Sequence, residues 1–154
     1  MTTEPIIAER SWQFPNRLPA LAEVAKEVFD WMAQLPLSSR AKYSTGLAVE
    51  EMASNAIKYG YDDAREHWIR LRIAATPNLM EIVFEDDGHP FDPTAHPAPD
   101  IEKIVNSRKT GGLGIELVRR ICEKMVYRRE GALNRLVLHI RRHDAHDTQP
   151  IPTL

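Results

Sequence analysis

The sequence predicts an α+β fold, a two-layer α/β sandwich in which one mixed β-sheet is covered on one face by three helices. Stretches with the apolar spacing of helices and stretches with strand character follow one another in the order β-α-α-β-β-loop-α-β-β. Because helices and strands do not alternate strictly, a doubly wound parallel sheet is not expected. A length of 154 residues is that of a single domain, and we place its core at about residues 10–142.

The first half of the chain is expected to form one strand and two helices. The strand covers residues 6–14, where a Pro-Asn pair then breaks it. Apolar residues at helical spacing predict the first helix over about 18–34. The second helix runs over about 38–59, with Ser38 or the serine after it as its N-cap. We expect Gly60 to end this helix in the left-handed conformation that glycine accepts.

The middle of the chain predicts a hairpin and then a long loop. Two strands, at about 67–75 and 79–85, are separated by a Thr-Pro-Asn turn. Residues 86–111 are rich in proline and aspartate, with room for one short helix at 101–106. A loop of more than about 15 residues in a compact domain is usually functional.

The last part is expected to contain a helix and two strands. A glycine pair opens the helix, which extends over about 111–124. Strands follow near 126–129 and 135–141, and the polar tail, 143–154, is expected to be frayed.

Composition excludes several functional classes. A net charge of -2 and a pI of about 6.3 predict no broad cationic surface, so we expect no direct nucleic-acid partner. The paired arginines Arg128 and Arg129 are interpreted as solvated charges. Cys122 is the single cysteine and is expected to be a small buried hydrophobe. With no signal-peptide layout and no apolar run near the ~20 residues of a membrane span, we expect a cytoplasmic protein with no membrane partner.

Glu51 and Asn55 are the first candidate site residues. Four residues apart on the second helix, they share one face among small apolar neighbours. An Asn oxygen is a neutral Mg²⁺ ligand, and a carboxylate one turn away can hold a metal-bound water or accept a proton. The alternative is that both lie on an exposed stripe and hydrogen bond to each other.

A second segment is Asp86 to Gly88, where an apolar strand ends in two aspartates and a glycine. Asp86 can accept a hydrogen bond from an amino group such as that of adenine, and Gly88 lets the backbone approach a flat base. The alternative is a simple Asp-Gly turn.

A third, glycine-rich segment opens the last helix: Arg108, Lys109, Thr110, Gly111, Gly112, Leu113 and Gly114. Backbone N–H groups at a helix N-terminus suit phosphate. The alternative is a flexible hinge. The spacing matches neither the dinucleotide-binding fingerprint nor the P-loop.

Together, the three segments resemble the N, G1 and G2 boxes of the GHKL (histidine kinase-like) ATPase superfamily. Residues 51–61 carry Glu-x-x-x-Asn-Ala-Ile-x-Tyr-Gly-Tyr, residues 86–93 carry Asp-Asp-Gly-His-Pro-Phe-Asp-Pro, and residues 110–115 carry Thr-Gly-Gly-Leu-Gly-Ile. With no segment for a further domain, the chain is most similar to the stand-alone bacterial anti-sigma-factor serine kinases. The resemblance implies a Bergerat-type ATP-binding fold.

The resemblance also implies a role for each residue. Asn55 coordinates Mg²⁺ and Glu51 is the general base. Asp86 binds the adenine amino group with Gly88 beside the base. The third segment, residues 108–114, binds the nucleotide, with Thr110, Gly112 and Gly114 as phosphate contacts and Lys109 or Arg108 neutralising charge.

Two departures from the family pattern concern the nucleotide contacts of the loop. Pro90 replaces the second glycine of the G1 box, and Asn134 occupies the strand position that many members fill with threonine.

The implied function is an ATP-dependent protein-serine/threonine kinase. It would phosphorylate a small antagonist (anti-anti-sigma) protein and also bind a sigma factor, as a homodimer. The alternative is a regulator whose affinity for a protein partner depends on bound nucleotide, with little or no phosphoryl transfer. A third hypothesis is a slow ATPase or a detached histidine-kinase-like module.

Overall fold

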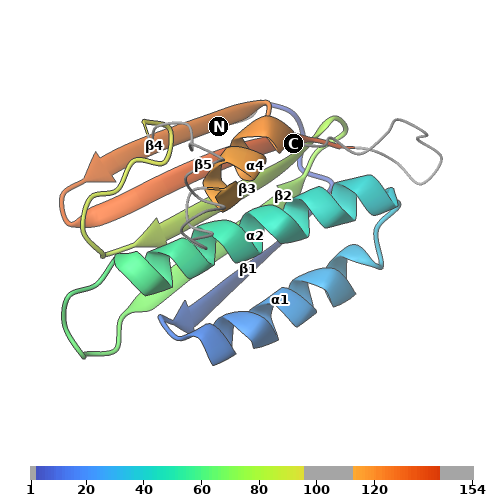
Figure 1. Cartoon of the computed structure of the whole chain (residues 1–154). Helices are drawn as coiled ribbons and strands as arrows, with labels where there is room; N and C mark the ends of the chain where they lie inside the picture. The colour runs from blue at the N-terminus through green and yellow to red at the C-terminus, as the bar shows by residue number, and fades with distance from the viewer. Residues whose placement is uncertain (1–2, 96–112, 143–154) are drawn as a thin grey trace.

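The computed structural model describes residues 3–95 and 113–142. Its helices and strands follow the predicted order: β1 (Ala8–Pro15), α1 (Leu18–Met32), α2 (Ser39–Tyr59), β2 (Trp68–Ala75), β3 (Leu79–Asp86), α4 (Leu113–Ile121), β4 (Lys124–Glu130) and β5 (Leu133–Arg141) (Figure 1). The expected short helix at 101–106 and the tail from residue 143 lie outside the described residues.

The five strands form one sheet in the order β1-β2-β3-β5-β4, and every pairing between neighbours is antiparallel. The α+β class is confirmed, but the prediction of a mixed sheet was wrong for the described strands. Two helices of opposite direction separate β1 from β2, so the chain reverses direction three times and β2 returns antiparallel to β1 (Figure 1). Between β3 and β4 the described residues form helix α4, and these two strands run in the same direction. They do not pair, because β5 lies between them.

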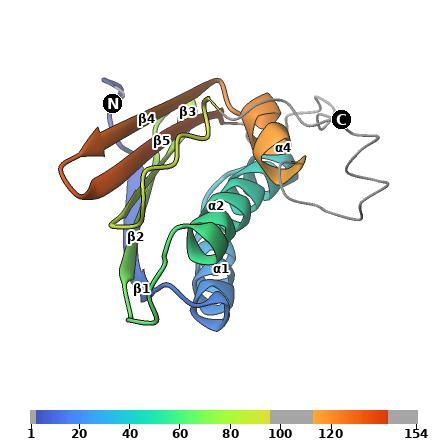
Figure 2. The same cartoon turned by 60° about the vertical axis from the view of Figure 1, so that its left-hand side comes forward.

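All three described helices cover the same face of the sheet, as predicted (Figure 2). Alternate residues of β3, including Met80, Ile82 and Phe84, are buried beneath them. Helix α2 meets the sheet through small residues such as Ala48 and Ala53, which allow the helix backbone to approach closely. This central helix carries the first candidate segment, and its position sets the geometry of the site.

The two ends of α2 differ in how well the sequence predicted them. Ser38 is the N-cap, as expected, and its Oγ accepts a hydrogen bond from the Ala41 N–H at 3.1 Å. Gly60 is not left-handed, since its φ of -88° and ψ of -10° continue the helix. Glycine is required for space instead, because a Cβ there would lie 2.5 Å from the Ala56 carbonyl oxygen.

Cys122 follows α4 directly and packs against the core cluster. Burial raises the pKa of its thiol to about 12, so the group stays protonated and serves packing, as predicted. Among the residues that the structure describes, no helix is both long enough and apolar enough to span a membrane.

Candidate functional site

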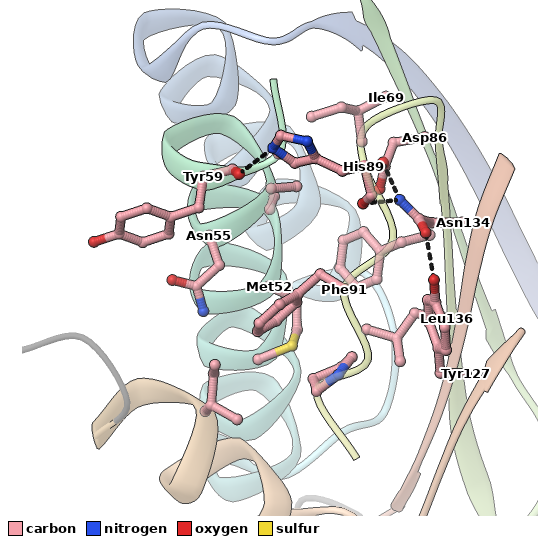
Figure 3. Close-up of a pocket in the computed structure, with 16 residues that line it drawn as sticks. Met52, Asn55, Tyr59, Ile69, Asp86, His89, Phe91, Tyr127, Asn134 and Leu136 are labelled. Atoms are coloured by element: carbon pink, nitrogen blue, oxygen red, sulfur yellow. Dashed lines mark hydrogen bonds between the residues drawn. The ribbon is translucent and has the colours of Figure 1, made fainter. Parts of the chain in front are cut away.

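A cavity of about 320 Å³ lies between α2 and the sheet, at the end where β3 terminates (Figure 3). Its volume falls in the range of small-molecule sites, roughly 300–1,000 Å³. Most of its lining is apolar, and it includes Met52, Ala56, Ile69, Phe84, Ile115 and Leu136. Two of the predicted site residues, Asn55 and Asp86, also line it. Figure 3 shows Asn55 on α2 at one side and Asp86 beside the strands at the other.

Asp86 is the last residue of β3, and its carboxylate is held by two donors. Oδ1 accepts the Gly88 N–H at 2.9 Å and the Asn134 Nδ2 at 2.9 Å. Across residues 3–95 and 113–142, no hydrogen bond involves Oδ2. An ionised carboxylate accepts hydrogen bonds only. This wall of the cavity therefore presents one acceptor to a ligand.

Asn55 lies one turn before the end of α2 and is partly buried. Within the described part of the chain, its amide makes no hydrogen bond. The interpretation that Glu51 and Asn55 pair with each other therefore finds no support in the structure. The carboxamide oxygen remains available to a ligand or to a metal ion.

Glu51 lies one turn earlier on α2 and reaches α4. A Cβ added to Gly114 would overlap the Glu51 carboxylate, so these two residues are in direct contact. The first turn of α4 thus packs on the acidic residue of α2, and the cavity extends to α4 through Ile115. The first and third predicted segments are brought together at this point.

Gly88 has a packing role in the structure. A Cβ at this position would lie 2.6 Å from the Gly60 carbonyl oxygen, so the missing side chain lets the turn after β3 approach the end of α2. That carbonyl also accepts the His89 N–H at 2.8 Å. Gly88 is not part of the cavity wall as described.

Five of the predicted nucleotide-binding residues lie outside the described residues: Arg108, Lys109, Thr110, Gly111 and Gly112. Leu113 begins α4, and Gly114 follows it, at the contact with Glu51.

Residues 14–140 match the model of the histidine kinase-like ATPase domain. The chain belongs to this family. It is 23% identical over 125 residues to the serine/threonine-protein kinase BtrW of Bordetella bronchiseptica, covering 79% of this chain and 88% of BtrW.

The fold of this histidine kinase-like ATPase domain also matches a solved structure. With a TM-score of 0.60 and 12% identity, it resembles the crystal structure of the RsbU and RsbW domains of Rv1364c from Mycobacterium tuberculosis. The match covers 92% of this chain and 35% of that chain, so our chain spans about a third of its length.

The structure adds residues to the site of this ATPase domain that the sequence did not single out. Tyr59, His89, Phe91 and Tyr127 line the cavity (Figure 3). The alternation of side chains along β4 and β5 places Tyr127 and Asn134 on the helix-covered face of the sheet. That alternation is visible in the sequence and could have identified both residues. Nothing in the sequence pattern singles out His89, whose Nε2 lies 3.0 Å from the Tyr59 carbonyl oxygen.

A histidine also joins the loop after α2 to the turn after β3. His67 Nε2 lies 2.8 Å from Asp63 Oδ1, and Nδ1 lies 3.1 Å from both carboxylate oxygens of Asp87. The ring stacks on Tyr61 at 4.6 Å between centroids, and the His67 side chain is only 15% exposed. Its bonds to Asp63 and then Asp87 raise the pKa of His67 above its usual 6.5, while the His67 bond lowers the pKa of Asp63.

These shifts predict a pH-dependent contribution to stability. A raised histidine pKa stabilises the folded state fully below pH 6.5, and that contribution is lost as pH rises through the folded-state pKa. The lowered pKa of Asp63 contributes above 3.8 and is lost as pH falls through its folded-state value. We expect the melting temperature of wild type to exceed that of His67→Gln most clearly between pH 3.8 and pH 6.5. The difference should be smaller at alkaline pH. Thermal unfolding across pH measures this, and a difference independent of pH would contradict it.

Proposed function

We propose that this chain is an ATP-dependent protein-serine/threonine kinase that phosphorylates a small antagonist protein and also binds a sigma factor. The observation that carries this proposal is the convergence of Asn55 and Asp86 on one cavity, with Glu51 beside the first turn of α4. The family is one of ATPase domains, and the similarity to a protein named as a serine/threonine-protein kinase supports transfer to a hydroxyl group.

The base of the nucleotide would lie against Asp86. Asp86 Oδ2, which accepts no hydrogen bond from the described residues, would accept one from the exocyclic amino group of adenine. The apolar residues of the cavity would pack against the faces of the ring. Tyr59 and Phe91 add aromatic surface to this cavity. The acceptor oxygen of Asp86 and the volume of the cavity therefore fit adenine.

The metal and the phosphates would lie toward Asn55 and α4. The Asn55 oxygen would hold Mg²⁺, which neutralises the charge of the phosphates. Residues 108–114 would contact the phosphates, with the backbone at the start of α4 supplying N–H donors and Lys109 or Arg108 adding positive charge.

Glu51 would act as the general base. Its carboxylate would accept the proton of the partner's serine hydroxyl, whose oxygen forms a bond to the γ-phosphorus. The bond from that phosphorus to the β,γ-bridging oxygen breaks, and ADP leaves with its electron pair. The contact of Glu51 with Gly114 supports this role, because Gly114 belongs to the segment proposed to bind the phosphates.

A transfer experiment tests the function. The purified protein is incubated with γ-labelled ATP, Mg²⁺ and candidate antagonist proteins, and labelled residues are identified by phosphopeptide mapping. Label on a serine or threonine of one partner supports the kinase. The second candidate function is a nucleotide-gated binding protein. This function requires only that the cavity binds a nucleotide, without transfer of phosphate. Complex formation that depends on ATP or ADP without label would favour it and count against the kinase.

Asp86→Asn is expected to weaken ATP binding by about tenfold, because the amide keeps an acceptor but loses the charge, which is worth roughly 1.5 kcal/mol. Discrimination against GTP should fall as well. Calorimetry with both nucleotides measures these effects. Asp87→Asn is the matched control, since the neighbouring carboxylate bonds His67 and does not line the cavity. Equal ATP affinity in wild type and Asp86→Asn would refute the assignment.

A further inference from the structure

The Asn134 carboxamide lies between β5 and the turn after β3, buried at 8% exposure. Its Nδ2 is 2.9 Å from Asp86 Oδ1 and 2.9 Å from the His89 carbonyl oxygen (Figure 3). It also lies 3.2 Å from the Gly88 carbonyl oxygen. All three of these atoms are acceptors. One amide nitrogen therefore contacts both the candidate base-binding carboxylate and the backbone that follows it.

The other end of the same amide is held by β4. Asn134 Oδ1 accepts the Tyr127 hydroxyl at 2.6 Å and Arg129 Nη1 at 3.1 Å. Arg129 Nη1 also donates to the Gly88 carbonyl at 2.6 Å. Arg129, which was interpreted from the sequence as a solvated charge, therefore contacts Asn134 and the turn after β3.

These partners permit only one orientation of the amide. A guanidinium can only donate, and backbone carbonyls can only accept. If the Asn134 amide were reversed, its NH₂ would face the N–H of Arg129, and its oxygen would face the carbonyl oxygens and the Asp86 carboxylate. Arg129 and the two backbone carbonyls therefore hold Nδ2 toward Asp86, and the Tyr127 hydroxyl adds a second donor to Oδ1.

The orientation of Asn134 in turn fixes the direction in which the remaining oxygen of Asp86 points. Oδ1 is shared by the Gly88 N–H and the Asn134 amide, and rotation of the carboxylate would break both bonds. Without Asn134, a single backbone bond would hold Oδ1. The carboxylate could then rotate or turn toward water, and an acceptor in a fixed direction would be lost.

We propose that Asn134 is a positioning residue for base selectivity. By holding Oδ1 of Asp86, it keeps Oδ2 directed to the 6-amino group of a purine, and Tyr127 and Arg129 set the direction of its amide. The inference rests on the nucleotide-binding function proposed above, and it names the residue through which β4 and β5 act on the choice of base.

A purely structural role would have a different signature. The same contacts join the end of the β4–β5 hairpin to the turn after β3. Loss of such a tie would weaken every nucleotide alike or lower the melting temperature. A positioning role instead changes the preference for a purine that carries the 6-amino group.

The test compares ADP with purine riboside diphosphate, which carries hydrogen in place of the 6-amino group. Calorimetry gives both dissociation constants for wild type, Asn134→Ala, Asn134→Asp and Tyr127→Phe. We expect Asn134→Ala to reduce the preference for ADP by about three- to tenfold, the value of one hydrogen bond. Asn134→Asp, which has the same shape but cannot donate when ionised, should reduce it at least as much. Tyr127→Phe should act in the same direction more weakly, since Arg129 remains.

Asn78→Ala is the control, because the Asn78 amide bonds Glu4 at the far end of the β2–β3 hairpin and its loss should leave the preference unchanged. Thermal unfolding verifies that each variant is folded. If Asn134→Ala does not fold, the preferences of Asn134→Asp and Tyr127→Phe test the inference. An unchanged preference, or equal weakening of both nucleotides, overturns the inference and leaves the kinase function in place. A wild-type protein that binds both nucleotides equally also overturns it. If wild type binds neither, the inference and the proposed function fail together.

Discussion

Glu51→Gln is expected to lower phosphoryl transfer by about 100- to 10,000-fold, the usual contribution of a general base. The amide has nearly the same shape but cannot accept the proton of the serine hydroxyl. Because Glu51 does not line the base cavity, the affinity for Mg-ATP should stay nearly unchanged. Single-turnover transfer to the partner protein and calorimetric ATP binding measure the two quantities separately.

Glu50→Gln is the matched control for this change. Glu50 is the preceding carboxylate on α2, exposed to solvent, so its loss removes the same charge from the same helix. Transfer at the wild-type rate is expected for this variant. If Glu51→Gln and Glu50→Gln behave alike, Glu51 is not the base and its contact with Gly114 serves packing.

Asn55→Ala should remove the Mg²⁺-dependent part of ATP affinity, a loss of about 10- to 150-fold. This corresponds to a polar contact with a charged group, roughly 1.5–3 kcal/mol. The carboxamide makes no hydrogen bond within the described residues, so its removal should cost little stability. Calorimetry with Mg²⁺ and with excess chelator separates metal-dependent binding from binding of the base.

Ser54→Ala provides the comparison for Asn55→Ala. Its hydroxyl bonds the Glu51 carbonyl oxygen within α2, and Ser54 does not line the cavity. In chelator, wild type, Asn55→Ala and Ser54→Ala should bind ATP equally. Equal affinities in Mg²⁺ as well would remove the metal-binding role of Asn55.

The order of the elements could be predicted because each has a local signal. Helical spacing, a serine N-cap and a Pro-containing turn set α1, α2 and the β2–β3 hairpin near their observed bounds. The contact between Glu51 of the first segment and Gly114 of the third agrees with the resemblance to the N and G2 boxes, which implied that these segments form one site. In the structure it depends on α4 packing across α2, which brings Gly114 to Glu51.

The remaining features could not be predicted, because they depend on neighbours distant in sequence. The described strands form no parallel pair because β5 lies between β3 and β4, and no local pattern encodes that insertion. Gly60 is held on one side by the Ala56 carbonyl oxygen and on the other by the turn after β3, which bonds its carbonyl, whereas the helix-end rule considers only the helix. The partners of Asn134 come from two separate segments of the chain, residues 86–89 and strand β4.

The end of α2 and the turn after β3 are joined by backbone through Gly60, His89 and the close approach of Gly88. Asn55 and Asp86 are therefore parts of one preorganised frame, although 31 positions of sequence separate them. A nucleotide that enters this frame spends little binding energy on ordering it. Affinity for the adenosine portion should then be nearly the same for ATP and ADP, and any difference between the two nucleotides must arise at the phosphates.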